Sequence, residues 1–115
     1  MTDCLFCRIV AGEVPSAKVY ETDDVLAFRD ITPKAPVHVL VIPKAHHIDV
    51  PALAADDPAL AATLLAAVTE VAAVEGVTET GYRLIFNVGR DSGQLVPHVH
   101  VHVLGGKPMG HDLST

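Results

Sequence analysis

The sequence predicts an α+β domain with a mostly antiparallel sheet of about five strands, one long helix and one short N-terminal helix. Three observations predict this class. Short runs rich in β-branched residues recur along the chain, with turn residues or prolines between them. One long run of alanine and leucine carries helix-capping residues at both ends. The 115 residues, half of them apolar, suffice for a single domain, residues 1–115, but are too few for two.

The first elements are delimited by the residues that interrupt them. Residues 4–10 have a short amphipathic helical pattern, and the Gly and Pro of residues 11–15 stop it. Residues 18–21 and 25–29 are typical of two strands, and the Thr-Asp-Asp turn at residues 22–24 joins them into a β-hairpin.

A third strand and the long helix follow. Residues 37–42 are rich in β-branched side chains and end at a proline, which is typical of a strand boundary. Asp57 and Pro58 form a helix start, because Asp is a good cap and Pro is tolerated in the first turn. Gly76 suits a left-handed helix end, so we expect a helix over residues 58–75 that packs on the sheet.

The last two predicted strands are residues 82–88 and 99–104. Around the second of them, His98, His100 and His102 alternate with valines. Alternate residues of a strand share a face, so all three imidazoles should project to one side and the valines into the core. Clustered imidazoles suit nucleophilic attack, proton transfer or metal binding, and composition alone does not choose among these.

Composition excludes several classes of partner. The formal net charge is −6 and no run of Lys or Arg occurs, which argues against a nucleic acid partner. No uninterrupted apolar stretch is long enough to span a membrane, and no basic segment leads into an apolar one at the N-terminus, so we expect a soluble cytoplasmic protein. Cys4 and Cys7 are too close in sequence to staple distant parts of a fold, and metal or redox use is the better interpretation.

The segment from His98 to Leu104 reads His-Val-His-Val-His-Val-Leu, and it resembles the signature of the histidine triad (HIT) family. Other blocks resemble the Hint-like branch of that family in order and spacing, in its bacterial form with a Cys-x-x-Cys pair. The resemblance covers the chain from Asp3 to about Gly106. The matching blocks are residues 3–15, 27–31, 36–44 and 93–94.

This resemblance implies a hydrolase or transferase, similar to a purine nucleoside phosphoramidase, for adenosine 5′-phosphoramidate or aminoacyl adenylates. The imidazole of His100 would attack the α-phosphorus and form a covalent nucleotidyl-histidine that water then hydrolyses. To attack through one ring nitrogen, the imidazole needs the other held as a donor, and a backbone carbonyl is the natural partner. His102 and His38 would support the phosphate. The family also implies a homodimer, in which the long helix and a neighbouring strand pack across a two-fold axis.

The resemblance further implies a pocket for an AMP-like nucleotide. Asn87 and Gln94 match polar positions that contact the phosphate, although both could instead cap the adjacent glycine-rich loop. Asp30 would accept hydrogen bonds from the ribose hydroxyls, or could be a turn residue. The apolar positions that would hold the base, each of which could equally be core, are Leu5, Phe6, Ile9, Val14, Phe28 and Ile31.

The same resemblance implies structural zinc. Its ligand positions correspond to Cys4, Cys7, His46 and His98, a closed Cys₂His₂ set with no open position for water. Such an ion would hold the N-terminal helix against the triad segment rather than activate a nucleophile. His47 could exchange roles with His46, and a pair of reduced, partly buried cysteines is the alternative.

The chain departs from the Hint-like pattern at Leu95, where that branch usually has Ser after Gly-Gln. The missing hydroxyl is one that would help to protonate a leaving group, so the departure bears on the phosphoramidate rate. Other functions stay open: hydrolysis of dinucleoside polyphosphates, a nucleotide-binding module with negligible turnover, and a metal carrier whose triad holds the ion. Transfer to a sugar phosphate is weaker, because transferases typically have Gln at the position of His102.

Overall fold

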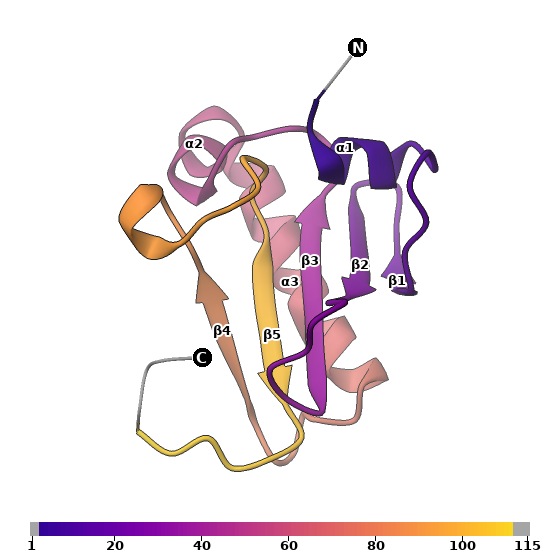
Figure 1. The fold of residues 1–115 in the computed structure, drawn as a ribbon, viewed down its shortest axis with the longest axis vertical. Helices are drawn as coiled ribbons and strands as arrows, with labels where there is room; N and C mark the ends of the chain where they lie inside the picture. Colours follow the sequence, from indigo (N-terminus) through magenta and orange to yellow (C-terminus); the bar gives the residue numbers. More distant parts are fainter. Residues whose placement is uncertain (1–2, 112–115) are drawn as a thin grey trace.

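In the computed structural model, which describes residues 3–111, five strands form one antiparallel sheet (Figure 1). The strand order is β1-β2-β3-β5-β4, so β4 is an edge strand and β5 lies between β3 and β4. The α+β class and the five strands are confirmed. The strands are β1 (Lys18–Glu21), β2 (Val25–Arg29), β3 (Val37–Pro43), β4 (Tyr82–Phe86) and β5 (Val101–Gly105).

Three α-helices accompany the sheet: α1 (Leu5–Val10), α2 (Val50–Asp56) and α3 (Pro58–Val74). The long helix starts as predicted, because the side chain of Asp57 accepts a hydrogen bond from the backbone N–H of Leu60 at 3.1 Å. Helix α2 is not predicted from the sequence; Asp49 caps it in the same way, through the N–H of Ala52 at 2.9 Å. Within the described part of the chain, no helix is both long and apolar enough to cross a membrane.

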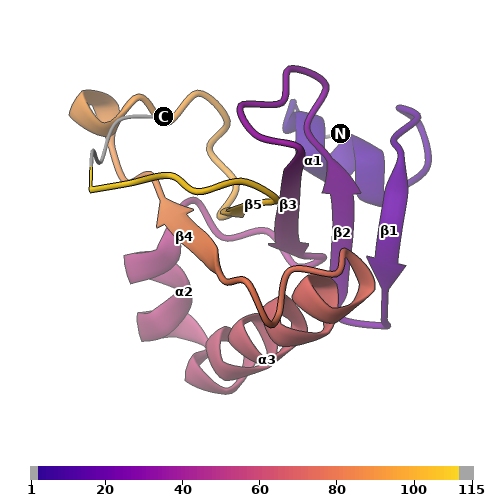
Figure 2. The ribbon, with the colours of Figure 1, turned by 90° about the horizontal axis from the view of Figure 1, so that it is seen from below.

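The sheet is covered on both faces, and its two core clusters follow the alternation of side chains. Helix α3 packs on one face (Figure 2), where Val25, Val39 and Val101 join residues of the helix in one buried cluster. On the opposite face, Leu26 and Leu40 pack with α1 in a second cluster. Strands buried on both sides need apolar residues at every position, which explains the continuous apolar runs of β2 and β3.

The chain passes very close to itself where β5 ends. Gly106 has a φ of +90°, and a Cβ placed there would lie 3.0 Å from the Cβ of Pro36 in the loop before β3. Only glycine combines this backbone conformation with that approach. The loop of residues 30–36 is therefore held against the end of β5.

We expect Gly106→Ala to destabilise the fold more than Gly81→Ala does. Both glycines have similar positive φ angles, but a Cβ at Gly81 would meet nothing within 4 Å. The left-handed conformation should cost about 1–2 kcal/mol in each variant, and displacement of Pro36 should add about 1 kcal/mol or more at Gly106. Urea denaturation of both variants measures the difference. Equal losses would contradict the close approach.

Candidate active site

The three histidines of the triad straddle the start of β5 rather than lying within a strand. Strand β5 begins at Val101, two residues later than predicted, because the N–H of Val99 bonds to the carbonyl of His47 at 2.7 Å instead of joining the ladder. The alternation nevertheless holds. The valines at 99, 101 and 103 are buried in the cluster against α3, and the imidazoles face the side that carries α1.

The ring of His100 is oriented for attack through one nitrogen. Its Nδ1–H donates to the backbone carbonyl of His98 at 2.8 Å, which leaves the lone pair on Nε2. The ring of Phe6 packs edge-on against it, with the centroids 5.1 Å apart. Burial lowers the pKa of His100, so the imidazole is neutral and nucleophilic at pH 7.

His38 and His102 form a hydrogen-bond chain whose protons are placed by the backbone. The N–H of Lys34 donates to Nδ1 of His38 at 3.0 Å, so His38 carries its proton on Nε2. That nitrogen lies 2.9 Å from Nδ1 of His102 and donates to it. His102 consequently carries its own proton on Nε2. Burial lowers the pKa of His102 to about 4, so this ring is also neutral at pH 7.

The carboxylate of Asp30 lies beside this hydrogen-bond chain. Oδ2 of Asp30 lies 3.5 Å from Nε2 of His38, and its Oδ1 accepts from the N–H of Thr32 at 2.7 Å. Burial is the largest effect on the pKa of His38 and lowers it, while the charge of Asp30 opposes that shift.

These side chains open into a pocket of about 500 Å³. The predicted site residues that line it are Phe6, Asp30, His38, Asn87, His100 and His102. Sequence reasoning missed several other lining residues. Leu104 continues the alternation of the histidines, which was the available signal, and Gly93 lies in the matching block of residues 93–94. The loop residues Thr32, Lys34 and Ser92 carry no comparable pattern.

The other predicted nucleotide-binding residues do not line this pocket. Ile9 and Phe28 are buried in the core cluster beneath Phe6, whereas Leu5 is 43% exposed and Ile31 is 99% exposed. Gln94 bonds only to backbone groups: its Nε2 donates to the carbonyls of Ile48 and Val96, and its Oε1 accepts from the N–H of Gly89. Gln94 thus ties the loop after β4 to neighbouring segments.

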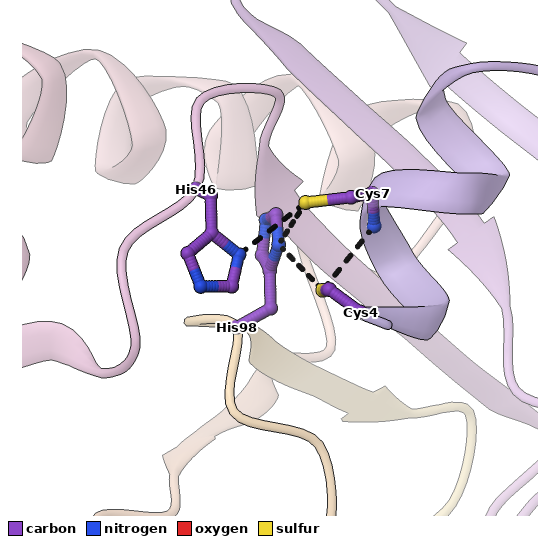
Figure 3. Close-up of side chains that lie close together, drawn as sticks. All are labelled: Cys4, Cys7, His46 and His98. Carbon is purple, nitrogen blue, oxygen red and sulfur yellow. Dashed lines mark hydrogen bonds between the residues drawn. The ribbon is translucent and has the colours of Figure 1, made fainter. Parts of the chain in front are cut away.

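Four thiol and imidazole side chains from three parts of the chain point toward one another (Figure 3). Cys4 and Cys7 come from the start of α1, His46 from the loop after β3, and His98 from the segment before β5. The Sγ of Cys4 lies 3.3 Å from Nδ1 of His98, and the Sγ of Cys7 lies 3.3 Å from Nδ1 of His46. The four donor atoms all lie within 4.8 Å of one another.

This cluster could hold a metal ion. Metal–sulfur and metal–nitrogen bonds of about 2.3 and 2.0 Å in a tetrahedron place sulfur and nitrogen about 3.5 Å apart, close to the distances found. Nε2 of His98 donates to the carbonyl of Pro43 at 2.8 Å, so its Nδ1 is left with a lone pair for an ion. His47 is not part of the group, because its Nδ1 lies 3.5 Å from the carboxylate of Asp56.

The same grouping weighs against a triad that itself binds a metal. In residues 3–111, His98 belongs to the cysteine cluster, whereas His102 is grouped with His38 and Asp30. His100 belongs to neither set of potential ligands. The three histidines of the triad thus have three different surroundings. His98 lies among potential metal ligands, His102 lies in a hydrogen-bonded group, and His100 keeps one ring nitrogen directed to neither group.

Comparison with known proteins finds a family model and relatives that cover most of the chain. The family model described as HIT domain matches residues 11–109. The chain is 42% identical over 112 residues to the purine nucleoside phosphoramidase of Escherichia coli K12, which covers 97% of this chain and 94% of that protein. It is 48% identical over 107 residues to a HIT-like protein of Azospirillum brasilense, over 92% of this chain and 88% of that protein.

Solved structures show the same likeness. A HIT family hydrolase from Clostridium thermocellum is similar with a TM-score of 0.94 and 42% identity, over 99% of both chains. A HIT family hydrolase from Legionella pneumophila is similar with a TM-score of 0.88 and 48% identity, over 93% of this chain and 96% of that one.

We expect the purified protein to contain one metal ion per chain and the double variant Cys4→Ser, Cys7→Ser to lose it. The melting temperature should fall by more than about 4 °C, because metal-binding energy is folding energy and 1 kcal/mol gives a shift of that size. Elemental analysis and thermal melting measure both effects. His46→Ala should also reduce the metal content, while His47→Ala, the matched control, should keep it. Unchanged metal in the cysteine variant would contradict the cluster.

Proposed function

The chain belongs to the HIT family, and from that premise we propose that it is a nucleotide hydrolase that cleaves purine nucleoside phosphoramidates through His100. The observation that carries the proposal is the held ring of His100, whose Nδ1 is bound to a carbonyl while the ring lines the pocket. The likeness to a purine nucleoside phosphoramidase supports the substrate class.

The proposed reaction has two displacements at the α-phosphorus. First, the lone pair on Nε2 of His100 forms a bond to phosphorus, and the bond from phosphorus to the leaving nitrogen breaks. The departing nitrogen keeps that electron pair and takes up a proton. Water then attacks the same phosphorus and gives up a proton, which balances the proton that the amine took up. The bond to Nε2 breaks, and its electrons return to the imidazole. One water is consumed, and an amine and a nucleoside monophosphate are released.

We propose that the hydrogen-bond chain from the backbone of Lys34 through His38 to His102 supports this chemistry by orienting the two imidazoles. Because the backbone of Lys34 sets the proton positions, His102 presents an Nε2–H that can donate to a phosphoryl oxygen. Positive charge that develops on His100 is stabilised at its Nδ1–H by the carbonyl of His98. All these donors are held before substrate binds, so little reorganisation is needed.

We propose that the nucleotide lies against the triad, beside Asp30, which follows β2, and Asn87, which follows β4. Asp30 has its Oδ2 turned toward His38 and can accept from ribose hydroxyls. Asn87 lines the pocket, which supports a position beside the phosphate. One hydrogen of its Nδ2 donates to the carbonyl of Ser92 at 2.9 Å, and the second can donate to a phosphoryl oxygen. We assign base contact to Phe6, which lines the pocket and packs with Ile9 and Phe28 in the core cluster, and loop support to Gln94. We propose the exposed side chains of Leu5 and Ile31 for the rim of the base site.

We propose zinc as the ion of the Cys4, Cys7, His46 and His98 cluster, because two thiolates and two imidazoles in a tetrahedron are a set that zinc favours. A complete set of four protein ligands supports a structural role.

We also propose a homodimer. Leu84 and Val88, at and after the edge strand β4, are exposed, as are Leu65 and Val74 on α3.

His100→Asn should abolish turnover while the fold and nucleotide binding persist. Asn cannot attack phosphorus, and loss of the nucleophile should lower kcat by at least about 10⁴-fold. Intact-mass measurement should detect a nucleotidyl adduct on the wild-type protein and none on this variant. An adduct that persists in the variant would exclude His100. His98→Ala is the companion variant, and it should lower the melting temperature far more than His100→Asn does.

Leu95→Ser should accelerate phosphoramidate hydrolysis selectively. Leu95 is 92% exposed and lines the pocket, so a hydroxyl there can approach a departing amine. An expelled amine must gain a proton, and a positioned donor typically contributes about 10²–10⁴-fold. A p-nitrophenolate leaving group is already a stable anion and should gain little. Equal acceleration of both substrates, or of neither, would show that the residue at 95 does not serve the leaving group.

A further inference from the structure

A second pocket adjoins the one that holds the triad. Its volume is about 240 Å³, and Lys34 and Leu104 line both pockets. The remaining walls come from Ala35 in the loop before β3, from Arg83 on β4 and from residues 107–109 in the segment that follows β5. That segment and the loop of residues 30–36 lie at the same end of the sheet (Figure 1). No residue of α1 or β2, the elements we assign to the base, lines this second pocket.

The second pocket is lined by positive charge in an acidic protein. Lys34, Arg83 and Lys107 line it, and among residues 3–111 no Asp or Glu does, although the chain has a net charge of −6. The five Lys and Arg residues outside this pocket each pair with a carboxylate. Within the described residues, neither Lys34 nor Lys107 makes such a pair. The charges of Lys34 and Lys107 are thus available to a ligand.

Strand register ties this pocket to the reacting centre. Leu104 is paired with His38 on β3 and with Arg83 on β4, so the three residues form one row across the sheet. Neighbouring strands lie about 4.8 Å apart, which puts the Cα atoms of His38 and Arg83 about 10 Å from each other. His102 precedes Leu104 by two positions on the same face. Nη2 of Arg83 donates to the carbonyl of Gly110 at 3.0 Å, which ties residue 110 of the segment after β5 to this row.

We propose that this pocket binds an oxyanion, a carboxylate or a phosphate, carried by the leaving group of the substrate. The inference rests on the proposed function, because it takes the phosphorus to lie at His100. With the base assigned to the side of α1 and β2, the group across the phosphate from it is the leaving group. A Lys-lined pocket binds an oxyanion through charge-assisted hydrogen bonds, while a neutral leaving group gains nothing there.

The test compares adenosine 5′-phosphoramidates that differ only at the far end of the amine. One series ends in a carboxylate after two to five methylene groups, the second in the matching carboxamide, and the third in a phosphate. We expect kcat/KM for the best carboxylate to exceed that for its amide by about tenfold or more, as one charge-assisted hydrogen bond predicts. A higher kcat/KM for the phosphate series than for the carboxylate series would identify phosphate as the better ligand. Equal kcat/KM values for these two series would indicate that the pocket recognises oxyanions in general.

Lys107→Gln should remove most of this preference and leave hydrolysis of the amide series unchanged. The matched control is Lys18→Gln, which removes the same charge on β1 at the opposite edge of the sheet and should keep the preference. Unchanged melting temperatures show that both variants are folded. A preference that survives Lys107→Gln, or falls equally in Lys18→Gln, would overturn the assignment of the pocket.

Binding separates this inference from the proposed function. The Kd of the carboxylate and amide conjugates can be measured on His100→Asn, which needs no turnover, and again with Lys107→Gln added. Tighter binding of the carboxylate that depends on Lys107 supports the inference even if no hydrolysis is seen on the wild type. Equal Kd values overturn it, even if a nucleotidyl adduct on His100 has confirmed the proposed function.

Discussion

The geometry of the candidate active site depends on how His98 is held. Its buried ring is engaged at both nitrogens: Nδ1 faces the sulfurs of Cys4 and Cys7, and Nε2 donates to the carbonyl of Pro43. The backbone carbonyl of the same residue accepts the Nδ1–H of His100. Because the ring is fixed from two sides, the carbonyl that orients the neighbouring imidazole is fixed with it. One residue therefore couples the cluster of potential metal ligands to the orientation of the His100 ring.

Helix α1 extends this coupling across the site. The helix carries the two cysteines at its start, and between them Phe6 packs edge-on against His98, His100 and Phe28. The six-residue helix is too short to be stable alone. Its position therefore comes from the cysteine cluster and from burial against the face of β2 and β3. A shift of α1 would move both a wall of the pocket and two potential metal ligands.

Local sequence pattern predicted most of the fold but only part of the site. The alternation of His and Val is confirmed even where β5 has not begun, because alternation needs an extended backbone and not ladder pairing. Helix α2 is missed because seven residues give too few turns for an apolar period to appear. The residues expected around the base divide between pocket, core and solvent. Hydropathy identifies an apolar side chain such as Ile9 or Ile31, but tertiary packing decides which way it faces.

The hydrogen-bond chain through His38 and His102 begins at a main-chain amide, that of Lys34. Every amino acid except proline supplies this donor. Mutational drift at this position can therefore change the side chain, and with it the charge of the adjoining pocket, while the tautomers of both histidines are inherited unchanged. Reactivity would therefore constrain the backbone path of the loop at position 34, where only proline would be excluded. Under the proposed role of the adjoining pocket, leaving-group preference can thus change without altering how the two histidines are held.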